Sequence, residues 1–172
     1  TRAFLDYCQN KGRESCLIVF DAHPDLMEPA SEFPTHEEWL RKLIEEGFPS
    51  ENVLLVGVRN SYSEEIKFIR GKKIKIISMN QLLLNLEDSC DTIMEFSNGR
   101  ELYLSLDIDV VDPVFAPSTG YLESGGLTSR QLIYLIQRIN KMKNLKAIDI
   151  VEINAEADRK KDNVTIKLGA KI

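Results

Sequence analysis

The segment Cys16–Asp25 (CLIVFDAHPD) decides the fold, because an apolar run ends there in three potential metal ligands. Cys16–Phe20 has the length and composition of a buried β-strand. Side chains two residues apart on an extended backbone point the same way, so Asp21, His23 and Asp25 are predicted to face one point. Carboxylates are costly in an apolar interior unless a cation holds them, which favours a divalent metal. The alternative is a strand that ends in an ordinary polar turn.

The composition excludes several classes of protein. The 172 residues carry a net charge of -5, with acidic and basic residues interleaved, so no basic stripe indicates a nucleic-acid partner. No apolar stretch approaches the roughly 18 residues that cross a bilayer, so no membrane partner is expected. The three cysteines lack the spacing of a metal site or a CxxC motif and suit a reducing compartment, which favours a cytoplasmic location.

Apolar runs alternate with helical patterns along the rest of the chain. The runs predict strands over residues 16–21, 53–58, 74–78, 101–107 and 145–153. Helices are predicted over residues 2–12, 36–46, 80–86, 91–96 and 163–172. Two more are predicted after capping signals, one that begins at Ser61 and one that begins at Thr128 and has Lys141 and Lys143 in its last turn. Strands rich in Ile, Leu and Val that alternate with helices indicate an α/β fold, with a parallel sheet covered on both faces. Ligands of such sheets bind beyond the carboxyl ends of the strands.

A second acidic pair completes the candidate site. Asp107 and Asp109 stand two residues apart at the carboxyl end of the strand predicted over 101–107, so both acidic clusters can face one crevice. Four carboxylates so close repel one another unless cations neutralise them, and two divalent ions would do so. Oxygen ligands with one imidazole favour Mn²⁺, and ions about 3.5–4 Å apart activate a water for hydrolysis. The alternatives are an Asx turn and a metal phosphatase, although no phosphate-binding glycine loop supports the phosphatase.

These segments resemble a known family. DAHPD at 21–25 and SLDIDVVDP at 105–113 are similar to the two dimetal signatures of the ureohydrolase superfamily, which contains arginase, agmatinase and formimidoylglutamase. Residues 118–120 and 125–128 resemble its glycine-rich loop, 149–154 the strand with its guanidinium-contacting glutamate, and 162–165 the start of its last helix. The resemblance implies an arginase-like, three-layer α/β/α fold with a mostly parallel sheet, and a centre of two Mn²⁺ ions.

The resemblance also implies a role for each acidic residue. Asp21 and Asp107 match the ligands that bridge the two ions. Asp25 matches a carboxylate of one ion, and His23 and Asp109 match ligands of the other. Asp25 is also expected to pass a proton to the leaving amine after hydroxide attacks a guanidinium carbon, which releases urea.

Two further catalytic residues follow from the resemblance. Glu152 matches the carboxylate that neutralises the guanidinium, a bidentate partner for that group. The alternative for Glu152 is an exposed charge at a strand end. His36 matches the histidine that shuttles protons near the leaving group, but the family usually has a small residue next, where this chain has Glu37. A structural histidine in the first turn of a helix is the alternative.

The chain also differs from the family because one metal-binding motif is absent from it. Family members carry a Gly-Gly-Asp-His motif, whose histidine is a further metal ligand, ahead of the stretch that Thr1–Asp25 resembles. We therefore expect a single domain over residues 1–172 that lacks the N-terminal strands and the first metal-histidine motif of the family. If the protein is really so short, a catalytically silent member becomes the alternative function.

The substrate remains open between several small guanidino or amidino compounds. The loop over residues 26–35 contains Glu28 and Glu32, with Ser31 and Thr35. The two acids favour an amine-bearing substrate such as agmatine over arginine, and a formimidoylglutamase-like hydrolase is a further alternative. The resemblance implies a homo-oligomer, a trimer or a hexamer.

Overall fold

One parallel sheet of five strands organises the molecule. The structure is a computed structural model that describes residues 1–172. The strands are β1 (Ser15–Phe20), β2 (Val53–Val56), β3 (Lys75–Ile77), β4 (Glu101–Asp107) and β5 (Leu145–Val151). They lie in the order β3-β2-β1-β4-β5, and every neighbouring pair is parallel. Each connection therefore crosses over the sheet, as the alternation of apolar runs and helical patterns predicts.

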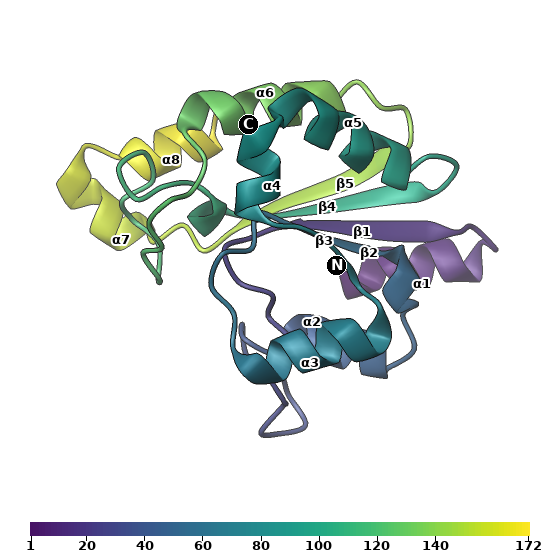
Figure 1. The fold of residues 1–172 in the computed structure, drawn as a ribbon. Coiled ribbons are helices and arrows are strands. Elements are labelled where there is room, and N and C mark those ends of the chain that lie inside the picture. The colour runs from purple at the N-terminus through teal and green to yellow at the C-terminus, as the bar shows by residue number, and fades with distance from the viewer.

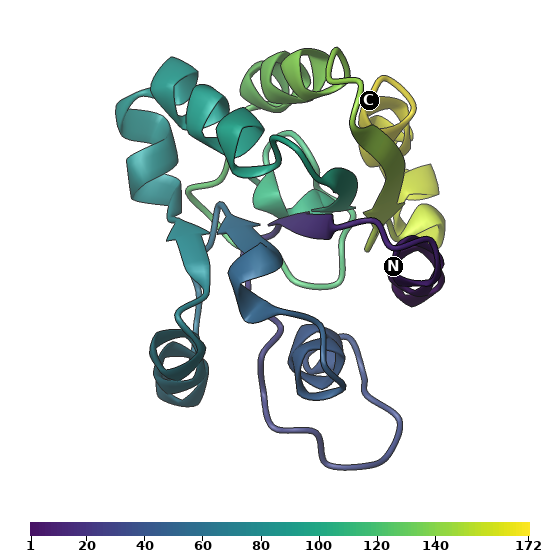
Figure 2. The same ribbon diagram turned by 90° about the vertical axis from the view of Figure 1, so that its right-hand side faces the viewer.

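Helices cover both faces of this sheet (Figures 1 and 2). On one face lie α1 (Arg2–Asn10), α2 (Trp39–Glu45) and α3 (Ser63–Lys72). On the other lie α4 (Met79–Leu84), α5 (Leu86–Phe96), α6 (Ser129–Ile139) and α8 (Val164–Gly169), and the short α7 (Ala155–Asp158) precedes α8. None of the helices combines the length and apolar character of a membrane span. The predicted three-layer α/β/α architecture with a parallel sheet is confirmed.

Strand β1 lies at the centre of the sheet, and all six of its residues are buried. Side chains alternate between the faces of a strand, so Ile18 and Phe20 join the core beneath α4, α5 and α6, whereas Leu17 and Val19 join the core beneath α2 and α3. Burial on both faces explains why the segment Cys16–Phe20 is apolar at every position instead of at every second one.

The start of α2 differs from its prediction. The carboxylate Oε2 of Glu38 accepts hydrogen bonds from the backbone N–H of Thr35 (2.6 Å) and from its hydroxyl (2.7 Å). This ring of bonds closes a turn before the helix, so α2 begins at Trp39 and not at residue 36. His36 therefore lies in the turn, outside the helix.

Other helix and strand boundaries also differ from their predictions for local reasons. Strand β5 ends at Val151, because Glu152 adopts a left-handed backbone with φ 62°. Helix α6 ends at Ile139, so Lys141 and Lys143 lie beyond its last turn. The segment predicted as one helix over 163–172 is helical only over α8, and α5 begins at Leu86 because the Asn85 side chain caps it.

The sheet brings the carboxyl ends of β1 and β4 together. The two strands are neighbours, and Phe20 pairs with Leu106 at their ends. Asp21 and Asp107 each follow one residue later, so both carboxylates emerge at the same edge of the sheet. This register is what positions the candidate site.

Gly126 permits the loop after β4 to close next to the site. The backbone of Leu127 exchanges hydrogen bonds with Val110 (3.0 Å) and Asp112 (2.9 Å). A Cβ atom at position 126 would lie 2.6 Å from both the amide nitrogen of Asp112 and the carbonyl oxygen of Val110. Only a residue without a side chain fits there.

We expect Gly126→Ala to lower the free energy of unfolding by about 1–3 kcal/mol, the usual effect of overpacking against atoms that cannot move. Gly71→Ala is the matched control, because Gly71 lies in α3 with open space where its Cβ would be. The control is expected to be neutral or to stabilise the protein by up to about 1 kcal/mol. Urea denaturation measures both, and equal effects of the two substitutions would contradict the packing explanation.

Candidate metal centre

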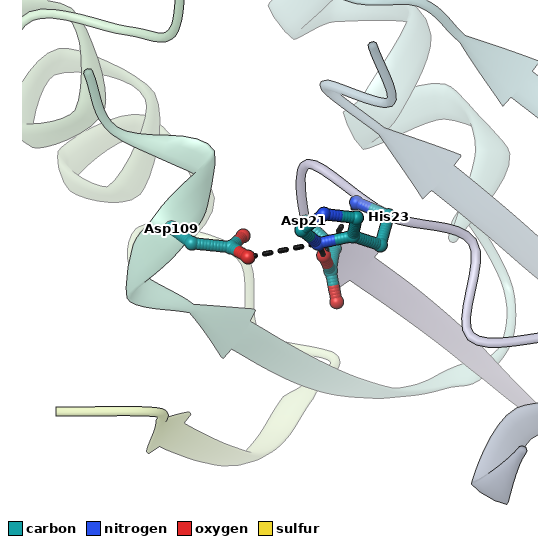
Figure 3. Close-up of side chains that lie close together, drawn as sticks. All are labelled: Asp21, His23 and Asp109. Atoms are coloured by element: carbon teal, nitrogen blue, oxygen red, sulfur yellow. Dashed lines mark hydrogen bonds and ion pairs between the residues drawn. The ribbon is translucent and has the colours of Figure 1, made fainter. Parts of the chain in front are cut away.

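Three potential ligands converge between the ends of β1 and β4 (Figure 3). One ligand atom each from Asp21, His23 and Asp109 lies within 4.8 Å of the other two. The Nδ1 atom of His23 is 2.9 Å from Oδ2 of Asp109 and 3.5 Å from Oδ1 of Asp21. The side chains of Asp21 and Asp109 are each 4% exposed, so this group of polar atoms is buried.

The same local turn shapes both acidic segments. Oδ1 of Asp21 accepts the backbone N–H of His23 (2.7 Å), and Oδ1 of Asp107 accepts that of Asp109 (2.8 Å). The Asx turns considered as an alternative are therefore present, and they leave the second oxygen of each aspartate free. A further bond, from the N–H of Ala22 to Oδ1 of Asp109 (3.0 Å), joins the two segments.

A cavity of about 230 Å³ adjoins this group, and its lining contains other predicted site residues. Asp21, Asp25 and Asp107 line it together with His36 and Glu152. Asp25 and Asp107 do not belong to the tight group of Asp21, His23 and Asp109. The five predicted ligands thus form two sets that share Asp21.

Burial makes the carboxylates of this site difficult to ionise. It raises the pKa of Asp21 well above its ordinary value, and the charges of Asp25 and Asp109 add to the effect. Burial, with the charges of Asp21 and Asp109, raises the pKa of Asp107 to about 10. Burial also raises the pKa of Asp25 to about 7, against a hydrogen bond from Trp39 that lowers it. In all three groups the largest cause is burial, which disfavours the charged form.

His23 supplies part of that charge. Burial lowers its pKa, but hydrogen bonds to Asp109 and Asp21 outweigh burial and raise it to about 11. Burial alone would raise the pKa of Asp109, yet the hydrogen bond with His23 holds it below its ordinary value. One imidazolium cannot neutralise four carboxylates, so the donor set suits divalent cations.

Comparison with known proteins identifies the family. The model of the arginase family matches residues 1–172. The chain belongs to the arginase family. An agmatinase of Bacillus anthracis is 35% identical over 139 residues, which are 80% of this chain and 46% of that protein. An arginase of Staphylococcus aureus (strain MRSA252) is 31% identical over 160 residues, which cover 83% of this chain and 53% of that protein. The resemblance to the ureohydrolases is thereby confirmed.

Solved structures of the arginase family share the fold. The arginase from Bacillus caldovelox has a TM-score of 0.82 and 28% identity, and the match covers 94% of this chain and 60% of that one. The formimidoylglutamase from Bacillus subtilis has a TM-score of 0.86, with 95% and 52% covered, and its 24% identity shows the fold alone. The chain spans about half the length of the curated relatives it matches.

His36 and Glu152, the two further catalytic residues that the resemblance implies, both line the cavity. His36 is exposed, and its ring centroid is 5.8 Å from that of Tyr121. Glu152 is exposed at the end of β5, and a Cβ added to Gly120 would lie 3.0 Å from its Oε2. No hydrogen bond or ion pair from a protein group holds either side chain, so both can turn toward a ligand.

Arg59 holds the backbone beside the candidate ligands, and the sequence did not predict this role. Its guanidinium donates to the carbonyl oxygens of Asp109 (2.7 Å), Glu123 (2.6 Å) and Ser124 (3.1 Å). It thereby ties the turn that carries one ligand to the loop of the glycine-rich segment. An arginine just after a strand has no local signal that would identify such a role.

Glu123 is the second missed residue. Its Oε1 accepts a hydrogen bond from Asn60 (2.7 Å) and lies 3.4 Å from Nε2 of His23. A carboxylate on the outer nitrogen of a histidine orients the ring and leaves the other nitrogen for a cation. Here that other nitrogen is the Nδ1 that faces Asp109.

Asp107→Asn should stabilise the metal-free protein at pH 8. The pKa of Asp107 is raised from 3.8 to about 10, so the fold favours its protonated form, and this carboxyl lowers stability progressively as pH rises through that window. Asparagine keeps the acceptor for the Asp109 N–H and removes the buried charge. We expect a gain of about 1–3 kcal/mol at pH 8 and little change at pH 4.

Urea denaturation in a chelator measures this gain, and the same titration with Mn²⁺ provides the contrast. The cation should stabilise the wild-type protein more than the Asp107→Asn variant. A variant that is less stable than the wild type at pH 8 without metal would show that the buried charge is already compensated.

Proposed function

We propose that the protein is a dimetal hydrolase that cleaves a C–N bond of a guanidino or amidino compound and releases urea and an amine, as an agmatinase or arginase does. The observation that carries the proposal is the convergence of the two family signatures. The backbone N–H of Ala22 and the imidazole of His23 both contact the carboxylate of Asp109, although Ala22 and Asp109 are 87 residues apart. Membership of the arginase family supports the same reaction class.

The donor set fits two Mn²⁺ ions. Asp21 would be shared between them, as the member common to both sets of ligands, and Asp107 would accompany it. His23 and Asp109 would hold one ion, and Asp25 the other. A pair of such ions would activate a water as the nucleophile at neutral pH and would polarise the carbon that this water attacks.

Asp25 is suited to hold and return a proton. It lines the cavity, and a carboxylate within hydrogen-bond reach of the attacking water can take up its proton and return it. In the proposed reaction Asp25 accepts a proton from the attacking water and delivers it to the leaving amine. His36, exposed at the same cavity, would exchange further protons between the leaving amine and solvent.

Glu152 would neutralise and orient the substrate. Its left-handed backbone turns the chain at the end of β5, and its side chain lines the cavity that Asp25 and Asp107 also line. A carboxylate accepts two parallel N–H bonds from a guanidinium or amidinium, which fixes the plane of the carbon under attack. Gly120 leaves room for that carboxylate.

The loop over residues 26–35 gives no contact that would select the amine half of the substrate. Thr35 is occupied by its bonds to Glu38, and the hydroxyl of Ser31 donates to the carbonyl of Phe33. Neither these residues nor the loop glutamates line the cavity. The preference for agmatine therefore remains a prediction, as do the oligomeric state and the cytoplasmic location.

Assays of the Mn²⁺-loaded protein should release urea from agmatine, arginine or a related guanidino compound. Asp109→Asn should reduce the rate by more than about 100-fold, because even residues behind the metal ligands contribute 10–100-fold. Lys67→Ala, an exposed position on α3, is the control and should leave the rate unchanged. Formamide from a formimino substrate would indicate the alternative hydrolase, and no product despite bound metal would indicate the silent member.

Glu152→Gln should raise KM for the guanidino substrate by about 10–100-fold, the loss expected for one charge-assisted hydrogen bond pair. Glu156→Gln, an exposed acid four residues later, is the control for a general loss of negative charge. Steady-state kinetics with the best substrate measures both. An unchanged KM in Glu152→Gln would leave Glu152 as a surface charge.

A further inference from the structure

The backbone of Asp25 is held in an unusual conformation by a buried glutamate. Asp25 has a φ of 55°, in the left-handed region that residues with a side chain rarely adopt. The next N–H, that of Leu26, donates to Oε1 of Glu65 (3.0 Å), and Glu65 is only 3% exposed. Such a conformation persists only where neighbouring groups determine it, and Glu65 of α3 is one of them.

The side chain of Asp25 is held by a second helix. Oδ2 of Asp25 accepts a hydrogen bond from the indole Nε1 of Trp39 at 2.7 Å. This is the one hydrogen bond that a protein group makes to the carboxylate, so Oδ1 has no protein partner. Trp39 and Asp25 both line the cavity with Asp21 and Asp107.

Trp39 is itself fixed. It is the first residue of α2, whose side chains Leu40, Leu43 and Ile44 are buried in the core below the sheet. Arg41 of the same helix forms an ion pair with Glu64 of α3 at 3.0 Å. The helices that hold the backbone and the side chain of Asp25 are thereby linked to each other.

An indole is well suited to this position. Its N–H donates one hydrogen bond and has no acceptor, so it can neither take a cation from the carboxylate nor lose its proton at ordinary pH. Its apolar rings exclude water from one side of the carboxylate. A side chain with those properties orients a ligand without becoming one.

We propose that Trp39 is a positioning residue, which holds Oδ2 of Asp25 so that Oδ1 faces the cation site. The inference rests on the proposed dimetal function. Because the chain contains a single tryptophan, the same contact makes Trp39 an intrinsic fluorescent reporter of whether the site is occupied.

Calorimetric titration of the metal-depleted protein with MnCl₂ tests the positioning role. Wild-type protein should bind two ions, and Trp39→Phe should weaken one of them by about 10–100-fold, the usual effect of losing a group that orients a metal ligand. Phe48→Leu is the matched control, because Phe48 also packs against the core of α2 but does not contact Asp25. It should leave both affinities unchanged.

Equal manganese affinities in wild type and Trp39→Phe would overturn the inference, as would an equal loss in Phe48→Leu. A wild-type protein that binds no manganese would overturn both this inference and the proposed function. Metal binding that weakens in Trp39→Phe, with no hydrolysis of any amidine, would support the positioning role and refute only the proposed function.

Fluorescence of the wild-type protein tests the contact even if Trp39→Phe fails to fold. Addition of Mn²⁺ should change the emission of Trp39 in proportion to the occupancy that calorimetry measures. Emission that stays constant while calorimetry records saturation would overturn the inference, because the indole would then be insensitive to the carboxylate it is proposed to hold.

Discussion

The parallel pairing of β1 with β4 is the constraint on which the site depends. Because Phe20 is paired with Leu106, the residues that follow must present Asp21 and Asp107 at one edge of the sheet. Nothing in the strand cores can relieve the resulting repulsion, since the neighbouring side chains are apolar. Protonation of Asp107 and the imidazolium of His23 relieve this repulsion in part, and divalent cations bound to the same side chains would relieve the rest.

Local pattern was sufficient to predict this much of the molecule. An apolar run reports burial on both faces, and a spacing of two reports which side chains share a direction, so the strands, the layers and the meeting of Asp21, His23 and Asp109 followed from the sequence. Helix starts were harder to predict because side chains compete with the backbone. The bond of Glu38 to Thr35 delays α2 by a turn, and that delay moves His36 out of the helix.

Contacts of side chains with the backbone of distant segments could not be predicted in this way. Arg59 reaches the loop at Glu123 across 64 residues of sequence, and Glu65 reaches Leu26 across 39. Neither residue has a distinctive neighbourhood in the sequence, because each acts on a backbone group that every residue possesses. Their roles depend on the packing of whole elements, which is decided by the core and not by the residues themselves.

The two sets of candidate ligands are held by different neighbouring elements. Glu65 and Trp39, from helices on one face, fix Asp25, whereas Arg59 fixes the turn of Asp109 and the loop that carries Glu123. The two sets of candidate ligands are therefore supported by different elements. A cation bound to both sets would couple them, and its binding would stabilise the folded chain. The stability of the fold would then depend on the occupancy of the site, because the two equilibria are linked.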